Sequence, residues 1–299
     1  GKRLTADMKT YAPKTVQRFK ASFALLEEFS KVCFRDVDFD TIDIEFYKEF
    51  SSFMANEKNY RPATMGKHIR TLKTFLNEAT EEGINKTLDY QKKSFKVVSK
   101  NDDETANIAL TEPELDEMFN LDLFDNQRLD RVRDLFLIGA NTGLRFSDFT
   151  DIKPENIRED KDGAFLEIIQ YKTKRTAIIP INETVKYILN KYNNQLPEPI
   201  SNQKFNEYIK EVANLCPLLH RLEMLSYVKG GKNIEENIER WTLVSSHTAR
   251  RSFATNAYER GTPVKSIMAI TDHKTEDSFR RYIKTSKRKQ AEIFREYQK

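Results

Sequence analysis

The sequence contains few of the residues that mark an extracellular, irregular or membrane-embedded protein. Its two cysteines, Cys33 and Cys216, are too few for a disulfide framework. Nine glycines and nine prolines among 299 residues argue against long irregular regions. No apolar run approaches the roughly 20 residues needed to cross a bilayer, and no apolar stretch follows Gly1 as it would in a signal peptide. We therefore expect a soluble, globular protein of a reducing cytosol.

Charge is abundant, and its uneven distribution suits a polyanionic partner. Charged residues make up 32% of the chain, and the net charge is +4. Residues 280–299 hold eight basic and two acidic residues, so they carry +6 and leave −2 for the rest of the chain. A second basic stretch, residues 86–100, holds five lysines and one Asp. Each patch alone is equally typical of a solvated helix face.

Residues 1–90 have the periodicity of helices rather than of strands. Three apolar stripes recur at helical spacing. They are formed by Val16, Phe19, Phe23 and Leu26, by Phe46, Phe50 and Phe53, and by Met65, Ile69, Leu72, Phe75 and Leu76. Gly83 is placed to end the third helix. We expect a small helical domain here.

A polar, lysine-rich stretch over residues 91–108 separates this domain from the next. It lacks a sustained apolar stripe, so we interpret it as the interdomain linker. Thr111 and Glu114 then form the pattern of a capping box, with Pro113 in the first helical turn. A helix that begins here opens a second domain over residues 109–299.

The second domain is expected to be mainly helical with one small β-hairpin. The isoleucine-rich runs 164–170 and 176–181 flank the charged segment YKTKR and predict the hairpin. The helix signals lie at residues 129–138 before Gly143, at residues 183–192, and at the start positions Ser201, Ser246, Pro263 and Thr275. The helix that starts at Thr275 is expected to carry Tyr282. The predicted fold class is mainly α with a small β-sheet.

Three short motifs of this domain hold residues suited to chemistry. They are TGLRFSD over Thr142–Asp148, HTAR over His247–Arg250, and His273 followed nine residues later by Tyr282. Each motif alone is weak evidence, because an Arg at a helix start is usually a surface residue and a Tyr at helical spacing usually packs. Their order and combination carry more information.

Together these residue types fit phosphoryl transfer. Arg145 and Arg250 can neutralise the non-bridging oxygens of a phosphate, because a guanidinium donates in a planar fork and stays charged. A tyrosine hydroxyl can attack phosphorus to form a phosphotyrosine. A lysine can protonate the leaving oxygen, and a histidine can orient groups or accept protons near neutral pH.

The motifs resemble those of the catalytic domain of the tyrosine recombinase (phage integrase) family. The family's first arginine motif, roughly TGLR-x-S-[DE], is intact over Thr142–Asp148, and its H-x-x-R motif matches His247–Arg250. His273 and Tyr282 match its final histidine and its nucleophile. The family's lysine lies in a β-hairpin between the two arginine motifs, which is the place of Lys172.

The resemblance covers the whole chain. The family carries a helical core-binding domain of SAM-like type ahead of a mixed α/β catalytic domain, which matches residues 1–90 and 109–299. Within the family the chain is similar to integrases of conjugative transposons and related mobile elements. Such integrases often carry a further N-terminal arm-binding domain, and the lack of an initiator Met leaves open whether one precedes Gly1.

The resemblance implies a site-specific DNA recombinase or integrase that cleaves and rejoins strands through a 3′-phosphotyrosine intermediate. In this mechanism Arg145 and Arg250 bind the scissile phosphate, and Tyr282 attacks it and frees a 5′-hydroxyl. The bond energy is retained in the exchange, so the resemblance implies no cofactor, neither ATP nor a metal ion. No glycine-rich phosphate loop or cluster of cysteine and histidine lies near the motifs.

The resemblance gives four more residues supporting roles. Lys172 would be the general acid, His247 a base or hydrogen-bond partner, and His273 a group that stabilises the transition state. Asp148 would hold an arginine or His247 from behind. Lys174 and Arg175 remain alternatives to Lys172, because a hairpin register cannot be read from one sequence.

One position departs from the family pattern. The residue before the final histidine is normally Gly and is Asp272 here. Its carboxylate could raise the basicity of His273, or the change could be a harmless substitution at a helix end, which is the reading we favour.

The partners implied are a double-stranded DNA recombination site and other copies of the chain. We expect a monomer without DNA, a homo-tetramer at the synapse and an accessory DNA-bending protein, in the bacterial cytosol at the nucleoid. Residues 288–299 form a short amphipathic segment that would dock on a neighbouring protomer, or pack within its own chain. The residues expected to contact the DNA backbone are Arg61, Lys67, Arg70, Lys73, Lys92, Lys93 and Lys96.

Three other functions make different predictions for this sequence. A monomeric type IB topoisomerase would share Tyr282 and both arginines, and only a supercoil-relaxation assay separates it from a recombinase. A non-catalytic DNA-binding protein on the same scaffold would be expected to lack the Tyr or an arginine. A helical protein-interaction module gives no reason for these motifs to occur in this order.

Overall fold

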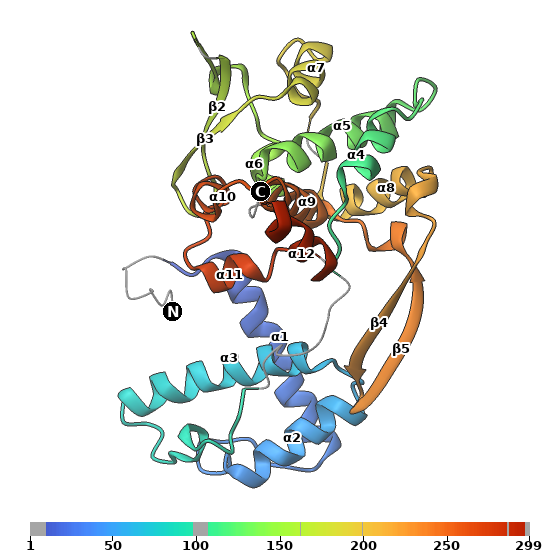
Figure 1. Cartoon of the computed structure of the whole chain (residues 1–299). Helices are drawn as coiled ribbons and strands as arrows, with labels where there is room; N and C mark the ends of the chain where they lie inside the picture. The colour runs from blue at the N-terminus through green and yellow to red at the C-terminus, as the bar shows by residue number, and fades with distance from the viewer. Residues whose placement is uncertain (1–9, 98–106, 162, 199, 286, 297–299) are drawn as a thin grey trace. The chain divides into compact units, whose positions relative to one another are not determined.

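The computed structural model describes residues 10–97, 107–161, 163–198, 200–285 and 287–296 (Figure 1). The chain divides into two compact units. The first comprises Gly1–Thr105 together with Leu225–Glu236, and the second comprises Ala106–Met224 together with Asn237–Lys299. Among the described residues, no helix is both long and apolar enough to cross a membrane.

The first unit is helical and has an aromatic core. Its helices are α1 (Pro13–Val32), α2 (Ile44–Asn56), α3 (Pro62–Glu81) and the short 3₁₀ helix η1 (Asp89–Gln91). The ring of Phe29 lies 5.2–5.5 Å from those of Phe46, Phe50 and Phe53, at angles typical of edge-to-face contact. Asp43 begins α2 by accepting a hydrogen bond of 2.7 Å from the amide of Phe46.

The predicted stripe of α1 is partly wrong. Ser22, Leu25 and Phe29 are its buried residues, whereas Phe23 is 49% exposed and Val16 is also exposed. Phe23 instead lines an apolar groove between α1 and α3. Two overlapping apolar stripes run along α1, and periodicity cannot tell which of them faces the core.

The core of each unit reaches into the segment that we expected to be a linker. Phe95 is fully buried in the first unit, and its carbonyl accepts a hydrogen bond of 3.1 Å from Nζ of Lys73. Ile108 is buried in the core of the second unit. Phe95 and Ile108, at the two sides of the proposed linker, thus belong to the cores of the two units. Residues 98–106, in the middle of the proposed linker, lie outside the described residues.

The second unit is built around one buried helix. This helix, α5 (Gln127–Thr142), is buried on nearly every side over residues 132–140 and packs against α4, α6, α7, α8 and α9. The helices around it are α4 (Glu112–Phe119), α6 (Phe146–Phe149), α7 (Glu183–Lys191), α8 (Asn202–Asn214), α9 (Ser246–Glu259), α10 (Val264–Thr271), α11 (Glu276–Arg280) and α12 (Lys287–Glu296). Short 3₁₀ helices lie at η2 (Pro154–Asn156), η3 (Pro217–Leu219) and η4 (Arg240–Leu243).

A three-stranded antiparallel sheet in the order β1-β2-β3 contains the predicted hairpin. The hairpin strands are β2 (Gly163–Ile169) and β3 (Thr176–Pro180), paired so that Leu166 faces Ile179. One face of the sheet packs on the core, because alternate residues such as Leu166 and Ile179 are buried. The additional strand β1 (Ile157–Asp160) was not predicted.

A second hairpin, β4 (Leu222–Lys229) and β5 (Lys232–Glu239), was also missed. Half of its strand residues are exposed and none is buried, so the hairpin lacks the buried face that marks a core strand in the sequence. The tip belongs to the first unit. There the amide of Gly230 donates to the carbonyl of Tyr60 at 3.4 Å, and the guanidinium of Arg61 lies 3.8 Å from the ring centre of Tyr227.

Several helix ends agree with the sequence analysis. Thr111 and Glu114 form the expected capping box, and Gly143 ends α5 in the left-handed conformation with φ 67°. Thr275 caps α11 by accepting from the amide of Ser278 at 3.2 Å. Helix α9 is capped by Ser245, one residue before the expected Ser246.

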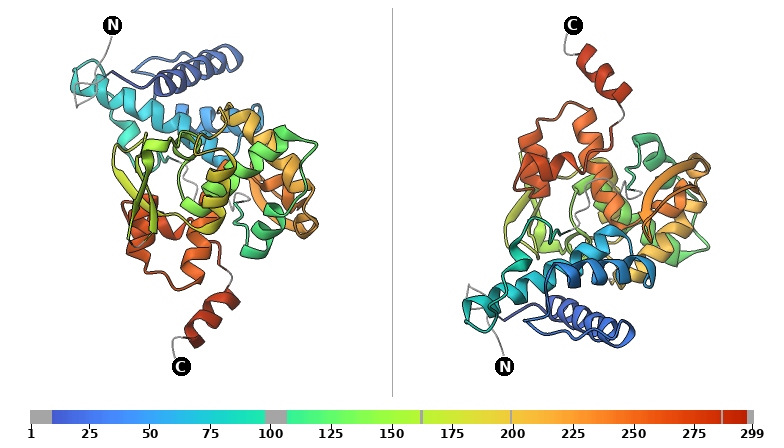
Figure 2. Two further views of the ribbon diagram at one scale, coloured as in Figure 1. Left: turned by 90° about the horizontal axis from the view of Figure 1, so that it is seen from above. Right: turned by 90° about the horizontal axis from the view of Figure 1, so that it is seen from below.

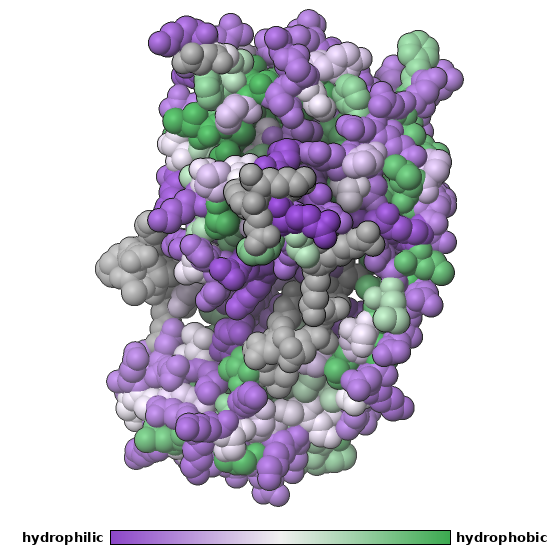
Figure 3. All heavy atoms as spheres, in the orientation of Figure 1, coloured by the Kyte–Doolittle hydropathy of each residue, from purple (hydrophilic) through white to green (hydrophobic). Residues whose placement is uncertain are grey.

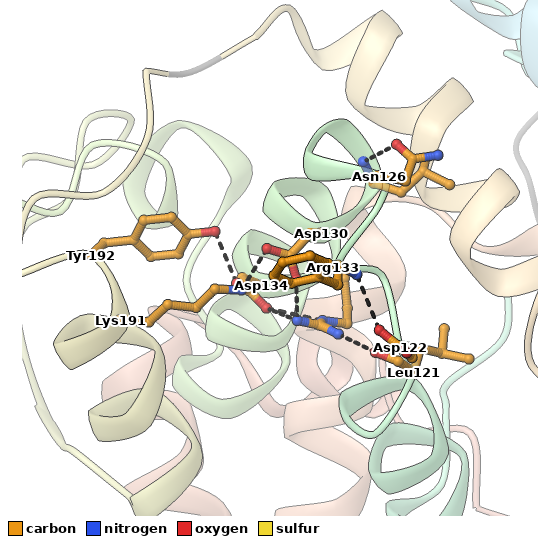
Figure 4. A network of polar contacts seen from close by, with 10 residues as sticks. Leu121, Asp122, Asn126, Asp130, Arg133, Asp134, Lys191 and Tyr192 are labelled. Carbon is orange, nitrogen blue, oxygen red and sulfur yellow. Dashed lines mark hydrogen bonds and ion pairs between the residues drawn. The ribbon is translucent and has the colours of Figure 1, made fainter.

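Buried charges tie α5 to α7 (Figure 4). Arg133 donates to Asp130 at 2.5 Å and to Asp134 at 3.0 Å, and Nζ of Lys191 donates to Asp134 at 2.7 Å. The Tyr192 hydroxyl adds a hydrogen bond of 2.9 Å to Asp134. Burial, followed by the charge of Asp134, raises the pKa of Tyr192, so this phenol remains a donor. Every carboxylate of the network is therefore matched by donors, as a buried charge requires.

The last described helix, α12, lies at the margin of the second unit. It contacts α9 and stands out from the unit in both views of Figure 2. Its Phe294 is 65% exposed. The face of the molecule shown in Figure 3 carries mostly hydrophilic side chains, with apolar ones in scattered places.

We predict that Asp134→Ala destabilises the second unit by about 3 kcal/mol, because it removes the more deeply buried of the two carboxylates that pair with Arg133 and Lys191. The single tryptophan, Trp241, packs on the core of this unit, so its fluorescence during urea unfolding reports the change. Arg158→Gln is the control, since it breaks only an exposed ion pair with Glu167 and should cost less than about 1 kcal/mol. Equal losses in the two variants would contradict the importance of this network.

Candidate active site

The turn between α5 and α6 positions Arg145. Gly143 adopts a positive φ where the ring of Phe253 leaves no room for a side chain, so this corner requires glycine. Arg145 follows as the N-cap of α6 and is half-buried. Its Nη1 donates to Oε1 of Gln170 at 2.5 Å. The guanidinium is thus held by a residue at the end of β2.

Arg250 of α9 is almost completely enclosed. It is 1% exposed, and its guanidinium donates to the carbonyls of Gly143, at 2.7 Å, and Thr271. Burial and the charge of Arg145 lower its pKa to about 10, so it stays cationic near neutral pH. Its Nε has no hydrogen-bond partner among the described residues. A buried N–H donor without a protein partner is available to bind an anion.

The C-terminal end of α10 brings several of these groups together. The last carbonyls of a helix lack partners within the helix. Here the carbonyl of Ile270 accepts from Nε2 of Gln170 at 3.2 Å, and that of Thr271 accepts from Arg250. Asp272 ends the helix in the left-handed conformation with φ 50°, which glycine adopts most easily and Asp tolerates.

His273 and Tyr282 lie against each other beyond that end. Their ring centres are 4.5 Å apart at 66°. The Thr271 hydroxyl donates to the carbonyl of Ile267 at 2.7 Å, so its oxygen accepts from Nδ1–H of His273 at 2.8 Å. Burial, then the charges of Arg250 and Arg145, lower the pKa of His273 to about 4. The ring is therefore neutral at physiological pH in the free protein.

Tyr282 occupies the turn that follows α11 rather than the helix itself, which corrects the sequence expectation. Its amide donates to the carbonyl of Phe279 at 2.8 Å. The guanidinium carbons of Arg250 and Arg251 lie 5.9 Å and 5.8 Å from its ring centre. The phenol thus lies beside two cationic groups.

His247 lies at the start of α9 and is exposed. Desolvation lowers its pKa, and the charges of Arg251, Arg250, Arg145 and Lys172 lower it further. His247 is therefore neutral near pH 7 and able to accept a proton. The charge of Lys172 is thus among those that act on His247.

The turn between β2 and β3 carries the lysines that the sequence left undecided. Lys172 is exposed, whereas Lys174 adopts a positive φ and directs its ammonium over the ring of Tyr171 at 4.5 Å. Asp148 accepts from the amide of Tyr171 at 2.8 Å. The expected partners of Asp148 were an arginine or His247, but its hydrogen bond goes to this turn. Its charge nevertheless acts on Arg250 by raising the pKa.

Three contributors were absent from the sequence analysis. Gln170 joins Arg145 to α10, Thr271 orients His273, and Arg251 lies beside Tyr282. Arg251 could have been suspected because it follows Arg250 directly. The other two are brought to the site only by the fold.

The candidate DNA-binding residues lie in the first unit and differ in their surroundings. Lys67, Arg70, Lys93 and Lys96 are exposed. The others have protein partners, namely Arg61 with Tyr227, Lys73 with the Phe95 carbonyl, and Lys92 with Asp89 at 2.6 Å.

The second unit thus assembles two arginines, two neutral histidines and one tyrosine at the ends of α5, α9, α10 and α11. Fixed guanidinium groups beside a hydroxyl suit binding of a phosphodiester and attack on its phosphorus. Among the described residues, no group of three or more His, Cys, Asp or Glu side chains is arranged to hold a metal ion.

We predict that His273 makes the free protein sensitive to acid. Its pKa is about 4 when folded and about 6.5 when unfolded, so the unfolded chain binds the proton more tightly. His273 therefore leaves the free energy of unfolding at its full value above about pH 6.5, and it lowers that free energy as the pH falls toward 4. Urea unfolding of His273→Gln should show a smaller loss between pH 7.5 and 4.5 than the native sequence. An identical loss in both proteins would refute the assignment.

Both parts of the chain match families of known proteins. A family model described as the phage integrase SAM-like domain matches residues 2–97, and one described as the phage integrase family matches residues 109–289. Transposase B from transposon Tn554 of Staphylococcus aureus is 23% identical over 289 residues, which are 94% of this chain. The chain spans only 43% of the length of that transposase.

Solved structures share the fold. A XerH site-specific recombinase bound to a difH substrate matches with a TM-score of 0.68 and 15% identity, covering 98% of this chain and 82% of that one. A lambda integrase dimer bound to a COC′ core site matches with a TM-score of 0.65 and 16% identity, covering 91% and 89%. Because the family models account for most of the sequence, the chain belongs to the phage integrase family.

Proposed function

We propose that the protein is a site-specific DNA recombinase that cuts and rejoins strands through a covalent bond to Tyr282. The observation that carries this proposal is the position of the Tyr282 ring beside Arg250, Arg251 and His273. A phenol in this place meets a phosphate whose charge the arginines neutralise. Of the matched proteins, the Tn554 protein is named a transposase, and the XerH structure is titled a post-cleavage complex with its DNA substrate.

In the proposed reaction, Tyr282 attacks phosphorus and its oxygen replaces the 5′-oxygen of the DNA. The bond from phosphorus to that 5′-oxygen breaks, and a 3′-phosphotyrosine remains. Arg145 and Arg250 bind the non-bridging oxygens, and the free Nε of Arg250 is one donor for them. Rejoining reverses the steps with a 5′-hydroxyl as the attacking group.

Two protons move in this reaction. Neutral His247 is the group suited to accept the proton of Tyr282, and Lys172 is suited to donate one to the leaving 5′-oxygen. Lys172 is preferred to Lys174, because the ammonium of Lys174 lies over Tyr171 while the charge of Lys172 acts on His247. His273 stabilises the pentavalent transition state in this scheme.

The proposed partners are a DNA recombination site and further copies of the chain. The exposed side chains of Lys67, Arg70, Lys93 and Lys96 supply backbone contacts in the proposal. Recombination of two duplexes requires four active sites, so we propose a tetramer at the synapse that forms from monomers on DNA. A DNA-bending protein and a location at the bacterial nucleoid complete the proposal.

The first test uses DNA fragments with a nick close to the cleavage point. After cleavage, the short strand that carries the free 5′-hydroxyl diffuses away, so rejoining is prevented and the covalent complex accumulates. Because the target sequence is unknown, a pool of nicked fragments serves as substrate, in buffer containing EDTA. The native sequence should give a protein–DNA band on a denaturing gel, and Tyr282→Phe should give none. Tyr187→Phe, which removes an exposed hydroxyl on α7, is the matched control and should behave as the native sequence does.

Each result of this experiment has a distinct meaning. A band with Tyr282→Phe would place the nucleophile elsewhere. DNA binding without a band in any protein would favour a non-catalytic binder. A band together with relaxation of supercoiled DNA by the monomer, without strand exchange between two sites, would favour a type IB topoisomerase.

We also predict that removal of residues 288–299 abolishes assembly of several copies on DNA and leaves folding intact. Helix α12 lies at the margin of its unit with Phe294 exposed, so its loss uncovers little core. Light scattering with DNA measures the assembly, and Trp241 fluorescence in urea measures the stability. Assembly and recombination that survive the truncation would show that the helix packs within its own chain.

A further inference from the structure

The turn at residues 170–175 is held by carboxylates on two sides. On one side, Asp148 accepts from the amide of Tyr171 at 2.8 Å. On the other side, Oδ1 of Asp272 accepts from Nη1 of Arg175 at 3.1 Å. Lys172 lies between these two attachments. Asp148 belongs to the first arginine motif, whereas Asp272 is the residue that departs from the family pattern.

The bridge between Arg175 and Asp272 joins an exposed cation to a buried anion. The Asp272 side chain is 4% exposed, and that of Arg175 is 60% exposed. Burial alone would raise the pKa of Asp272, but the charges of Arg175 and Arg145 outweigh it, so the pKa is lowered. Arg175, the direct ion-pair partner of this carboxylate, comes from the turn itself.

The helix end does not require a carboxylate at position 272. The backbone there is left-handed, and glycine adopts this conformation with less strain than Asp. A buried carboxylate also costs stability unless it is paired. The contacts of Asp272 are with the turn, so the turn supplies the physical reason for Asp in this place.

We propose that Asp272 is a positioning residue that fixes the turn carrying Lys172 to the segment carrying His273. The bridge to Arg175 holds one end of the turn while Asp148 holds the other, and the backbone of Lys172 between them is thereby held in place before DNA binds. The benefit to chemistry rests on the proposed function of Lys172 as general acid. The attachment of the turn itself does not.

Hydrogen exchange tests the attachment without DNA. The reporter is the amide of Lys174, which donates to the carbonyl of Gln170 at 2.9 Å and closes the turn. Asp272→Gly suits the left-handed backbone, and its Lys174 amide should exchange about tenfold faster than in the native sequence. Arg175→Gln should give a similar increase, and the double variant should add little to either one.

Two further variants separate this effect from general loosening of the sheet. Arg175→Lys keeps a cation opposite Asp272 and should restore most of the protection. Glu167→Gln breaks the exposed ion pair with Arg158 on the same sheet and should leave the Lys174 amide unchanged. An exchange rate in Asp272→Gly within about twofold of the native rate, or an equal increase in Glu167→Gln, would overturn the proposal.

A second readout uses a cleaved sequence recovered from the fragment pool. With a normal 5′-oxygen, Asp272→Gly should slow formation of the covalent complex about tenfold. With a bridging sulfur in its place, the bond from phosphorus to sulfur breaks and a thiolate leaves without a proton, so the defect should disappear. The same rescue is expected for Lys172→Ala and not for Arg145→Ala.

The two readouts distinguish the possible failures. Faster exchange with an unchanged rate of covalent-complex formation would show that Asp272 holds the turn without positioning Lys172. A defect that sulfur does not rescue would show that it acts on another group. If the native sequence forms no covalent complex at all, the proposed function fails, and the attachment is judged by exchange alone.

Discussion

The site depends on the buried guanidinium of Arg250. It joins the corner after α5 to the end of α10 by donating to the carbonyls of Gly143 and Thr271. An enclosed charge is costly unless it is fully bonded, and a helix-end carbonyl is costly unless it has a donor. Each therefore satisfies the other. The residue proposed to bind phosphate also holds together the two segments that carry Arg145 and His273.

This arrangement orders the site before substrate is present. Gln170 restrains Arg145 from behind, Thr271 sets the tautomer of His273, and both residues are themselves bonded to carbonyls of α10. The lowered pKa of His273 follows from burial beside two arginines. Groups that are oriented in advance need little reorganisation when charge develops in a transition state. Burial, together with the cationic surroundings that suit a phosphate, therefore keeps both histidines neutral without it.

Features encoded by neighbouring residues could be predicted from the sequence, and features created by distant contacts could not. The glycine corner at Gly143, the capping box at Thr111 and the alternation of β2 and β3 are local. The motif residues were identified by their order. By contrast, Gln170 reads as the end of a strand, and only the fold places it between Arg145 and Ile270. The second hairpin was missed because neither strand packs a face against a core: β5 is mostly polar, and Leu222 and Met224 of β4 are exposed.

The central claim is that the active site is preassembled around Arg250, and a crystal structure of the chain without DNA tests it most directly. The account predicts that the guanidinium of Arg250 bonds both the Gly143 and Thr271 carbonyls, and that Gln170 spans from Arg145 to Ile270. It would be contradicted by an Arg250 side chain turned toward solvent, with water on those two carbonyls and Tyr282 away from His273.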